Sequence, residues 1–213
     1  HSMADSDDFE ELEAQSARNF GIAAAKAGIK RIIFLGALSQ SKNEESSKHM
    51  SSRHMTGEIL KSSGVPTIEF RASVIIGTGS MPFEAVRALV ERLPVMVTPS
   101  WVRGELQPIS AGDLKNYLIK ALDIEPINTV IEIGGADVVR YQDLMKMYSD
   151  VRGLRRFMIP VPVITPRLSS HWLRLVTPAH YKIGRRIVES AVHRSVVSSD
   201  TASKLFNIKP LGT

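Results

Sequence analysis

Two loops of this chain carry the residues whose types and spacing suit ligand binding. One loop comprises residues 36–40 (GALSQ), and the other runs from Arg71 to Gly79. Each follows a predicted buried strand, and in a parallel α/β sheet the loops that follow the strands form the ligand crevice. Arg71 offers a cation to a phosphate or carboxylate; the alternative is a salt bridge with Glu69 or another acid. We therefore predict the active or binding site at these two loops.

His54 and the turn at residues 77–80 (GTGS) are further candidates for chemistry. The unperturbed pKa of histidine lies near neutrality, so His54 suits proton transfer; the alternative is an exposed histidine in the first turn of a helix. The turn follows a strand and precedes a helix, as a phosphate loop does, but an isolated GTG favours a plain turn. The six histidines show no metal-ligand spacing, so no metal site is predicted.

Alternating strands and helices are predicted to position these groups. The unbroken apolar run at residues 32–35 is typical of a parallel strand covered on both faces. Residues 67–74 and 130–133 predict two more strands of this sheet. Helical spacing of apolar residues predicts helices at 9–27, 55–64, 83–93, 110–122, 141–148 and, in two pieces, 165–194. The pattern indicates an α/β fold.

Some local features of these elements are also predicted. The apolar face of the first helix comprises Phe9, Leu12, Phe20, Ala23, Ala24 and Ala27. Gly28 and Gly64 end the first two helices, and Ser110 caps the fourth, with Asp113 in a capping-box-like position. The segment 157–163 contains two prolines and is expected to be an edge strand or an extended segment.

Composition limits the class of protein. Of 213 residues, 43% are hydrophobic and 23% are charged, and no apolar run approaches the length of about 20 residues that a membrane span needs. The chain has no cysteine, which favours a reducing, cytoplasmic location. Residues 151–213 hold 11 of the 27 Lys and Arg but only 2 of the 22 Asp and Glu. Because no nucleic-acid motif accompanies this charge, we expect a basic surface that faces an acidic part of the same protein.

Four blocks of sequence resemble one known group of proteins: GIKRIIFLGAL, SGVPTIEFRASVIIGTGS, QPISAGDLKNYLIKAL and IEIGGADVVRYQDLM. In this order they resemble the atypical, extended short-chain dehydrogenase/reductases, especially the bacterial NmrA-like and nucleoside-diphosphate-sugar-epimerase-like NAD(P)-binding proteins. The resemblance implies a Rossmann-like doubly wound parallel sheet in residues 1–137 and a small, mostly helical substrate or interaction lobe in residues 138–213. It also implies NAD(P) as cofactor and a small-molecule or nucleotide-linked substrate.

The family begins with a Gly-rich G-x-x-G-x-x-G turn, which this sequence lacks. Three strands also make a sheet too narrow for a complete doubly wound domain, so we expect the C-terminal part of a longer protein. Without the phosphate-binding turn, the chain is expected not to hold NAD(P) by itself. Its uncovered sheet edge predicts dimerisation or aggregation. His1-Ser2-Met3 resembles the end of the family's fourth strand and is interpreted as native sequence rather than a vector remnant.

The resemblance assigns roles to individual residues. Family oxidoreductases use a serine and a Tyr-x-x-x-Lys pair; Ser39 lies near the serine position, while Met50 and His54 take the pair's positions. Ser39 and His54 are therefore the catalytic candidates, although a loop hydroxyl bonded to its own backbone is the alternative for Ser39. The cofactor-binding candidates are His1, Ser2, Gly36, Ala37, Leu38, Arg71, Ala72 and Ser73.

Two functions follow from these assignments. The first is an NAD(P)-dependent oxidoreductase or epimerase, in which Ser39, His54 and His1 are the polar partners of hydride transfer. The second is a redox-inert NAD(P)-binding regulator or assembly protein of the NmrA type. The absence of a Tyr-x-x-x-Lys pair anywhere in the chain favours the second.

Overall fold

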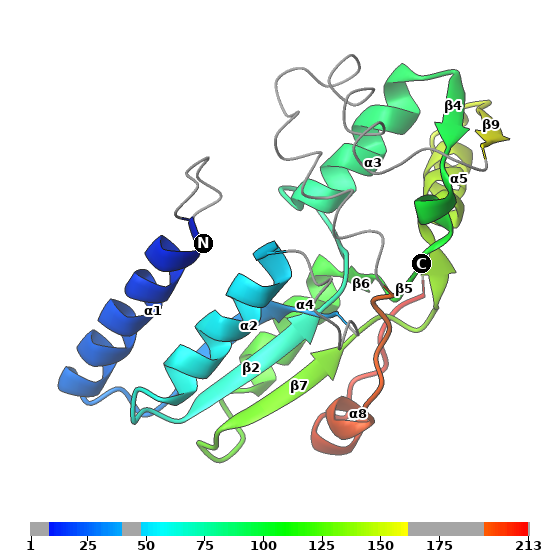
Figure 1. Ribbon diagram of the computed structural model, residues 1–213. Helices are drawn as coiled ribbons and strands as arrows, with labels where there is room; N and C mark the ends of the chain where they lie inside the picture. The colour runs from blue at the N-terminus through cyan, green and yellow to red at the C-terminus, as the bar shows by residue number, and fades with distance from the viewer. Residues whose placement is uncertain (1–8, 40–47, 162–193, 213) are drawn as a thin grey trace.

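The computed structural model describes residues 9–39, 48–161 and 194–212, and it has the predicted α/β fold. At its centre β2 (Thr67–Ala72) lies between β1 (Ile32–Ala37) and β7 (Thr129–Ile133), with all three strands parallel (Figure 1). The three strands that the apolar runs predict therefore form one sheet. β2 is its middle strand and is almost entirely buried, as expected when helices cover both faces.

Helices lie over both faces of this sheet (Figure 1). On one face, α1 (Phe9–Lys26) packs against α2 (Lys48–Lys61), and both contribute to an apolar cluster with β1. On the other face, α4 (Ala111–Lys120) and the short α8 (Thr201–Leu205) belong to a second cluster with β2 and β7. The strands therefore lie between two layers of helices.

Side chains alternate between these two faces along β2. Ile68 and Phe70 are completely buried in the cluster beneath α4, where the Phe70 ring centroid lies 6.2 Å from that of Tyr117. Glu69 and Arg71 therefore point to the opposite face, toward α2. The middle strand thus presents apolar side chains to one helical layer and charged side chains to the other.

The predicted helix boundaries hold where a local signal sets them. Gly28 and Gly64 follow α1 and α2 with φ angles of 65° and 83°, a left-handed conformation that glycine adopts without steric strain. Ser110 caps α4, because its hydroxyl accepts a 2.9 Å hydrogen bond from the Asp113 N–H. These three sequence predictions are confirmed.

The predicted apolar face of α1 is wrong in part. Leu12 and Phe20 are 48% and 59% exposed, whereas Ala14, Ala17 and Ala24 are buried. Small side chains let two helices approach closely, and α1 uses such a stripe to pack against α2. Hydrophobic spacing alone wrongly predicted that the large side chains Leu12 and Phe20 would be buried.

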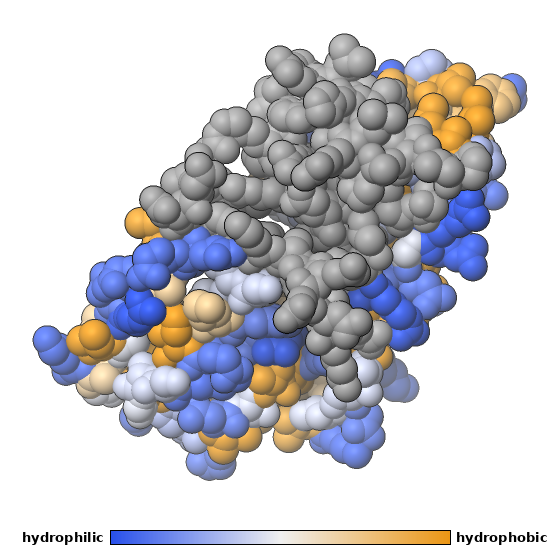
Figure 2. All heavy atoms as spheres, viewed as in Figure 1, coloured by the Kyte–Doolittle hydropathy of each residue, from blue (hydrophilic) through white to orange (hydrophobic). Residues whose placement is uncertain are grey.

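A second group of elements forms a lobe around its own apolar core (Figure 1). The group comprises α3 (Met81–Arg92), β4 (Val95–Thr98), α5 (Tyr141–Val151) and β9 (Phe157–Pro160). β4 and β9 form a two-stranded parallel sheet, so the start of segment 157–163 is the extended strand that was predicted. This sheet exposes three apolar side chains, Val95, Phe157 and Ile159. Apolar surface is visible where β4 and β9 lie, at the upper right of Figure 2.

Short elements join the lobe to the sheet. They are β3 (Ile75–Ile76), paired with β6 (Ile109–Ser110), β5 (Glu105–Leu106), paired with β8 (Val139–Arg140), and the 3-10 helix η1 (Ser100–Arg103). The predicted division at residues 137 and 138 stays a prediction, and all but the last residue of the helical segment predicted at 165–194 falls outside the described residues. Within the described part of the chain, no helix is both long enough and apolar enough to cross a membrane.

Candidate functional site

The structure brings the two predicted loops together at the carboxyl ends of β1 and β2. Ala37 and Ala72 are register partners at the ends of these strands. One residue further, the Leu38 N–H donates a 2.8 Å hydrogen bond to the Ala72 carbonyl. The backbone positions predicted to contact a cofactor therefore lie together at the carboxyl ends of β1 and β2. In an α/β sheet, ligands bind at these ends of the strands.

His54 reaches this edge from α2. Its Nε2 lies 3.3 Å from the Ala37 carbonyl oxygen, which only accepts hydrogen bonds, so Nε2 is the donor. The ring is half-buried, and the predicted alternative of an exposed histidine is not what the structure shows. Burial and then the nearby Arg71 guanidinium lower the pKa of His54 below its usual value of 6.5. A neutral ring whose Nε2 carries the hydrogen keeps Nδ1 as a proton acceptor.

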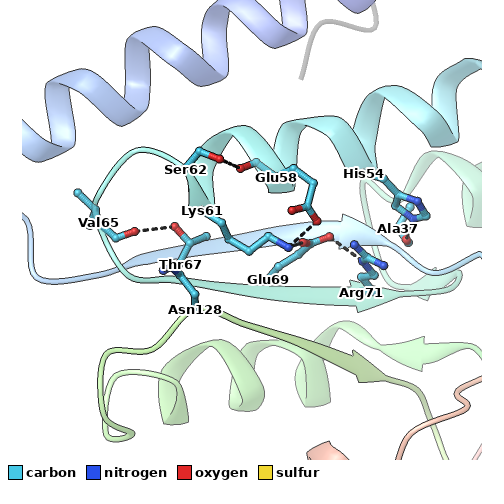
Figure 3. A network of polar contacts seen from close by, with 10 residues as sticks. All are labelled: Ala37, His54, Glu58, Lys61, Ser62, Val65, Thr67, Glu69, Arg71 and Asn128. Atoms are coloured by element: carbon cyan, nitrogen blue, oxygen red, sulfur yellow. Dashed lines mark hydrogen bonds and ion pairs between the residues drawn. The ribbon is translucent and has the colours of Figure 1, made fainter.

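Arg71 lies between His54 and a buried carboxylate (Figure 3). Its Nε donates a 2.6 Å hydrogen bond to Oε1 of Glu69, whose side chain is completely buried. The second oxygen, Oε2, lies 3.4 Å from the ammonium group of Lys61, which also pairs with the exposed Glu58 at 2.6 Å. The salt bridge that the sequence offered as the alternative for Arg71 is therefore present. A role for Arg71 in cofactor binding stays a prediction.

The two serines near the strand ends differ in what the structure shows. Ser39 is half-buried and follows the end of β1, the position predicted for a catalytic hydroxyl. Ser73 follows β2, and its Oγ is buried without a hydrogen-bond partner among the described residues. A buried hydroxyl without a partner is unfavourable; the cofactor contact predicted for Ser73 stays a prediction.

The sequence did not predict that a third segment, around Ser195, lies beside the end of β1. Ser195 donates a 2.6 Å hydrogen bond from its hydroxyl to the Leu38 carbonyl, and its backbone pairs with Glu105 and Gln107. The Gln107 side chain in turn bonds the Val197 N–H and the Gly135 carbonyl. Residues 157 positions apart meet in the first of these contacts. No local signal predicts such pairing; only the chain's return across the sheet creates it.

The GTGS turn is a closed backbone turn. The Ser80 N–H bonds the Gly77 carbonyl at 3.2 Å, and Gly79 has a φ angle of 82°. Ser80 precedes α3 without a side-chain capping bond. The geometry is that of the plain turn favoured from the sequence.

The remaining predictions concern His1, Ser2, Met50 and metal binding. His1 and Ser2 lie outside the described residues, whereas Met50 belongs to α2, one turn before His54. Across the described ranges, no three metal-binding side chains cluster. A hollow of about 350 Å³ lies along α4 and the C-terminal tail, lined by Asp113, Asn116, Ile119, Lys120, Asn207, Ile208 and Lys209. None of these residues is at the ends of β1 and β2, so the hollow is separate from the predicted site.

Known proteins match this chain in structure but not in sequence. No family model matches the chain, and no curated protein matches it either. Solved structures do. A nucleoside-diphosphate-sugar epimerase from Staphylococcus aureus superposes with a TM-score of 0.69 at 15% identity, covering 95% of this chain and 70% of its own.

Two further matches were solved with a bound dinucleotide. They are the triphenylmethane reductase of Citrobacter sp. with NADP(H), at a TM-score of 0.67, and an NADPH-dependent quinone oxidoreductase of Escherichia coli with NADPH, at 0.70. Their identities to this chain are 20% and 16%; the matches cover 94% and 93% of it, and 68% of each neighbour. The chain therefore has the Rossmann-like fold of NAD(P)-binding reductases and epimerases, as the resemblance implied.

Proposed function

We propose that this chain forms the substrate-facing wall of an NAD(P)-dependent oxidoreductase or nucleoside-sugar-epimerase-like protein. The shared fold supports the class of protein. The observation that carries the proposal is His54, a half-buried histidine with a lowered pKa at the edge where β1 and β2 end. In such folds this edge binds the ligand, and a neutral imidazole there suits transfer of a proton.

The residues present fit the nicotinamide end of a dinucleotide better than its phosphates. Gly36, Ala37, Leu38 and Ala72 provide backbone at the strand ends, and Ser73 provides an uncompleted buried hydroxyl. No Gly-rich phosphate turn occurs in the sequence, so we propose that binding of the dinucleotide's pyrophosphate needs residues outside this chain. When bound, the nicotinamide would supply a hydride donor or acceptor.

The chain's own residues would move the accompanying proton. With Nε2 held by the Ala37 carbonyl, Nδ1 of His54 accepts a proton from a substrate hydroxyl during oxidation and returns it during reduction. Ser39, which follows the end of β1, would hydrogen-bond the same substrate oxygen. The substrate class is a small molecule or a nucleotide-linked sugar, and we propose that the part of the chain from residue 138 onward forms its second wall.

A redox-inert function is the second candidate, and one observation favours it. The position of the family's catalytic tyrosine is Met50, which cannot donate a proton, and no Tyr-x-x-x-Lys pair occurs elsewhere. Under this alternative the crevice binds a dinucleotide as a signal or a structural group, as in regulators of the NmrA type.

NADPH binding and turnover by the full-length protein separate these functions. The enzyme proposal predicts NADPH oxidation with some member of a carbonyl and nucleotide-sugar panel, and a loss of about 10²-fold or more in kcat for His54→Ala. Ser62→Ala is the matched control, because its hydroxyl bonds the Glu58 carbonyl at the other end of α2. Tight NADPH binding without turnover would contradict the enzyme and favour the redox-inert function. Absence of binding of both NADPH and NADH would overturn both functions.

A further inference from the structure

The buried carboxylate of Glu69 occupies a space that two glycines leave open. A Cβ at Gly57 of α2 would lie 2.6 Å from the carboxyl carbon of Glu69, and one at Gly36 of β1 would lie 3.2 Å from Oε1. The first distance is too short for any side chain without movement of the carboxylate. Helix and strand backbones therefore enclose Glu69, so that its carboxylate is fixed between β2 and α2.

Arg71 uses only one of its donors to bind this carboxylate. Its Nε donates to Oε1 of Glu69, and its side chain is 20% exposed. Among the described residues the two terminal nitrogens of Arg71 have no hydrogen-bond partner, yet they are not fully buried. They therefore reach solvent, and the fork of N–H groups that suits carboxylates and phosphates is open.

Arg71 is not the sole cation beside Glu69. Lys61 already lies 3.4 Å from the other oxygen, Oε2. The second carboxylate near Lys61 belongs to Glu58, which is 66% exposed and thus solvated by water. One buried carboxylate therefore has two cations, and the outer one, Arg71, lies at the strand end beside His54 (Figure 3).

We propose that the terminal nitrogens of Arg71 bind an anionic oxygen group, a carboxylate or a phosphate, of the ligand in this crevice. Glu69 is the positioning residue: it holds the guanidinium through Nε and leaves the fork facing outward. The proposal rests on the proposed function only for the location of the crevice; it holds equally for an enzyme and for a redox-inert protein.

Anion titration followed by NMR tests this site, with inorganic phosphate and oxalate as separate probes at constant ionic strength. The wild-type protein is expected to show a saturable shift of the Arg71 Nε–H signal with one probe or both, and the two arms distinguish phosphate from carboxylate. Arg71→Lys keeps a positive charge beside Glu69 but lacks the planar fork, so it should fold and bind the anion about 10-fold more weakly.

Glu69→Gln tests the positioning role separately. The amide keeps an acceptor for Arg71 but loses the charge that fixes it, so anion affinity should fall about 3-fold or more. Arg87→Met, which removes an exposed arginine of α3, is the matched control and should leave anion affinity unchanged. Absence of a saturable shift with both probes, or equal affinity in wild type and Arg71→Lys, would overturn the proposal. Loss of NADPH turnover with anion binding intact would instead overturn only the proposed enzyme.

Discussion

The central sheet and the lobe treat charged side chains in opposite ways. On the face of the sheet that α2 covers, Glu69 is completely buried and its two cations are only 16% and 20% exposed. In the lobe, the ion pairs of Glu91 with Arg87 and Arg152 lie on the surface, with side chains 36–58% exposed. The core of the lobe is apolar, and burial in it raises the pKa of the Tyr141 phenol to about 12.

This difference supports the proposal that the ligand binds beside the central sheet. Exposed ion pairs contribute little because water screens them. A buried carboxylate is unfavourable without partners, and replacing such a pair by apolar residues is often neutral or stabilising. Glu69 and Arg71 therefore contribute less to stability than apolar packing would, and we expect that ligand binding is what they serve. The lobe shows no comparable cluster among the described residues.

Removing a cation from the buried cluster should have the largest effect. Arg71→Met leaves Glu69 with Lys61 alone, so we expect the free energy of unfolding to fall by about 2–3 kcal/mol, less than for a fully isolated charge. Urea unfolding measures this loss. A change below about 0.5 kcal/mol would mean that the cluster is as weakly coupled as the surface pairs of the lobe.

Adding one methyl group next to Glu69 should have a somewhat smaller effect. Gly57→Ala places its Cβ against the carboxylate, so the carboxylate must shift or α2 must move away from β2. We expect a loss of about 1–2 kcal/mol by the same measurement. Gly112→Ala in α4, where the nearest side-chain atom would be 3.6 Å away, is the control and should be neutral or slightly stabilising.

The pH dependence of stability should report His54 next. Because its pKa is lowered on folding, the unfolded chain binds the proton first as pH falls below 6.5. Wild-type stability should therefore decrease between pH 7 and pH 5 by more than that of His54→Gln. An equal change in the free energy of unfolding with pH in the two proteins would show that folding does not lower the pKa of His54.

The smallest effect should come from the lobe. Arg87→Met removes ion pairs of 3.3 Å and 3.9 Å with Glu84 and Glu91, but its side chain is 48% exposed. We expect a change within about 0.5 kcal/mol. A loss as large as that of Arg71→Met would remove the contrast between the two regions.

The sequence predicted those parts of the fold that local signals determine. The apolar run at 32–35 gave a strand, and Gly28, Gly64 and Ser110 set helix boundaries, because each acts within a few residues of itself. The edge formed by β1 and β2 was also predictable, since parallel strands align their carboxyl ends.

Features that depend on distant contacts were not predictable. The burial of Glu69 depends on Gly36 and Gly57 coming together from different elements. The contact of Ser195 with the Leu38 carbonyl depends on the path of the chain's last described segment. Neither has a signature in local sequence.

Hydrogen exchange of the full-length protein with and without NADPH tests the central claim most directly. The claim is that the edge formed by β1 and β2, and not the lobe, contacts the ligand. We predict slower exchange in peptides covering residues 36–39 and 71–74, and unchanged exchange in α5. Protection confined to α5 and β9, or to the hollow along α4, would contradict it.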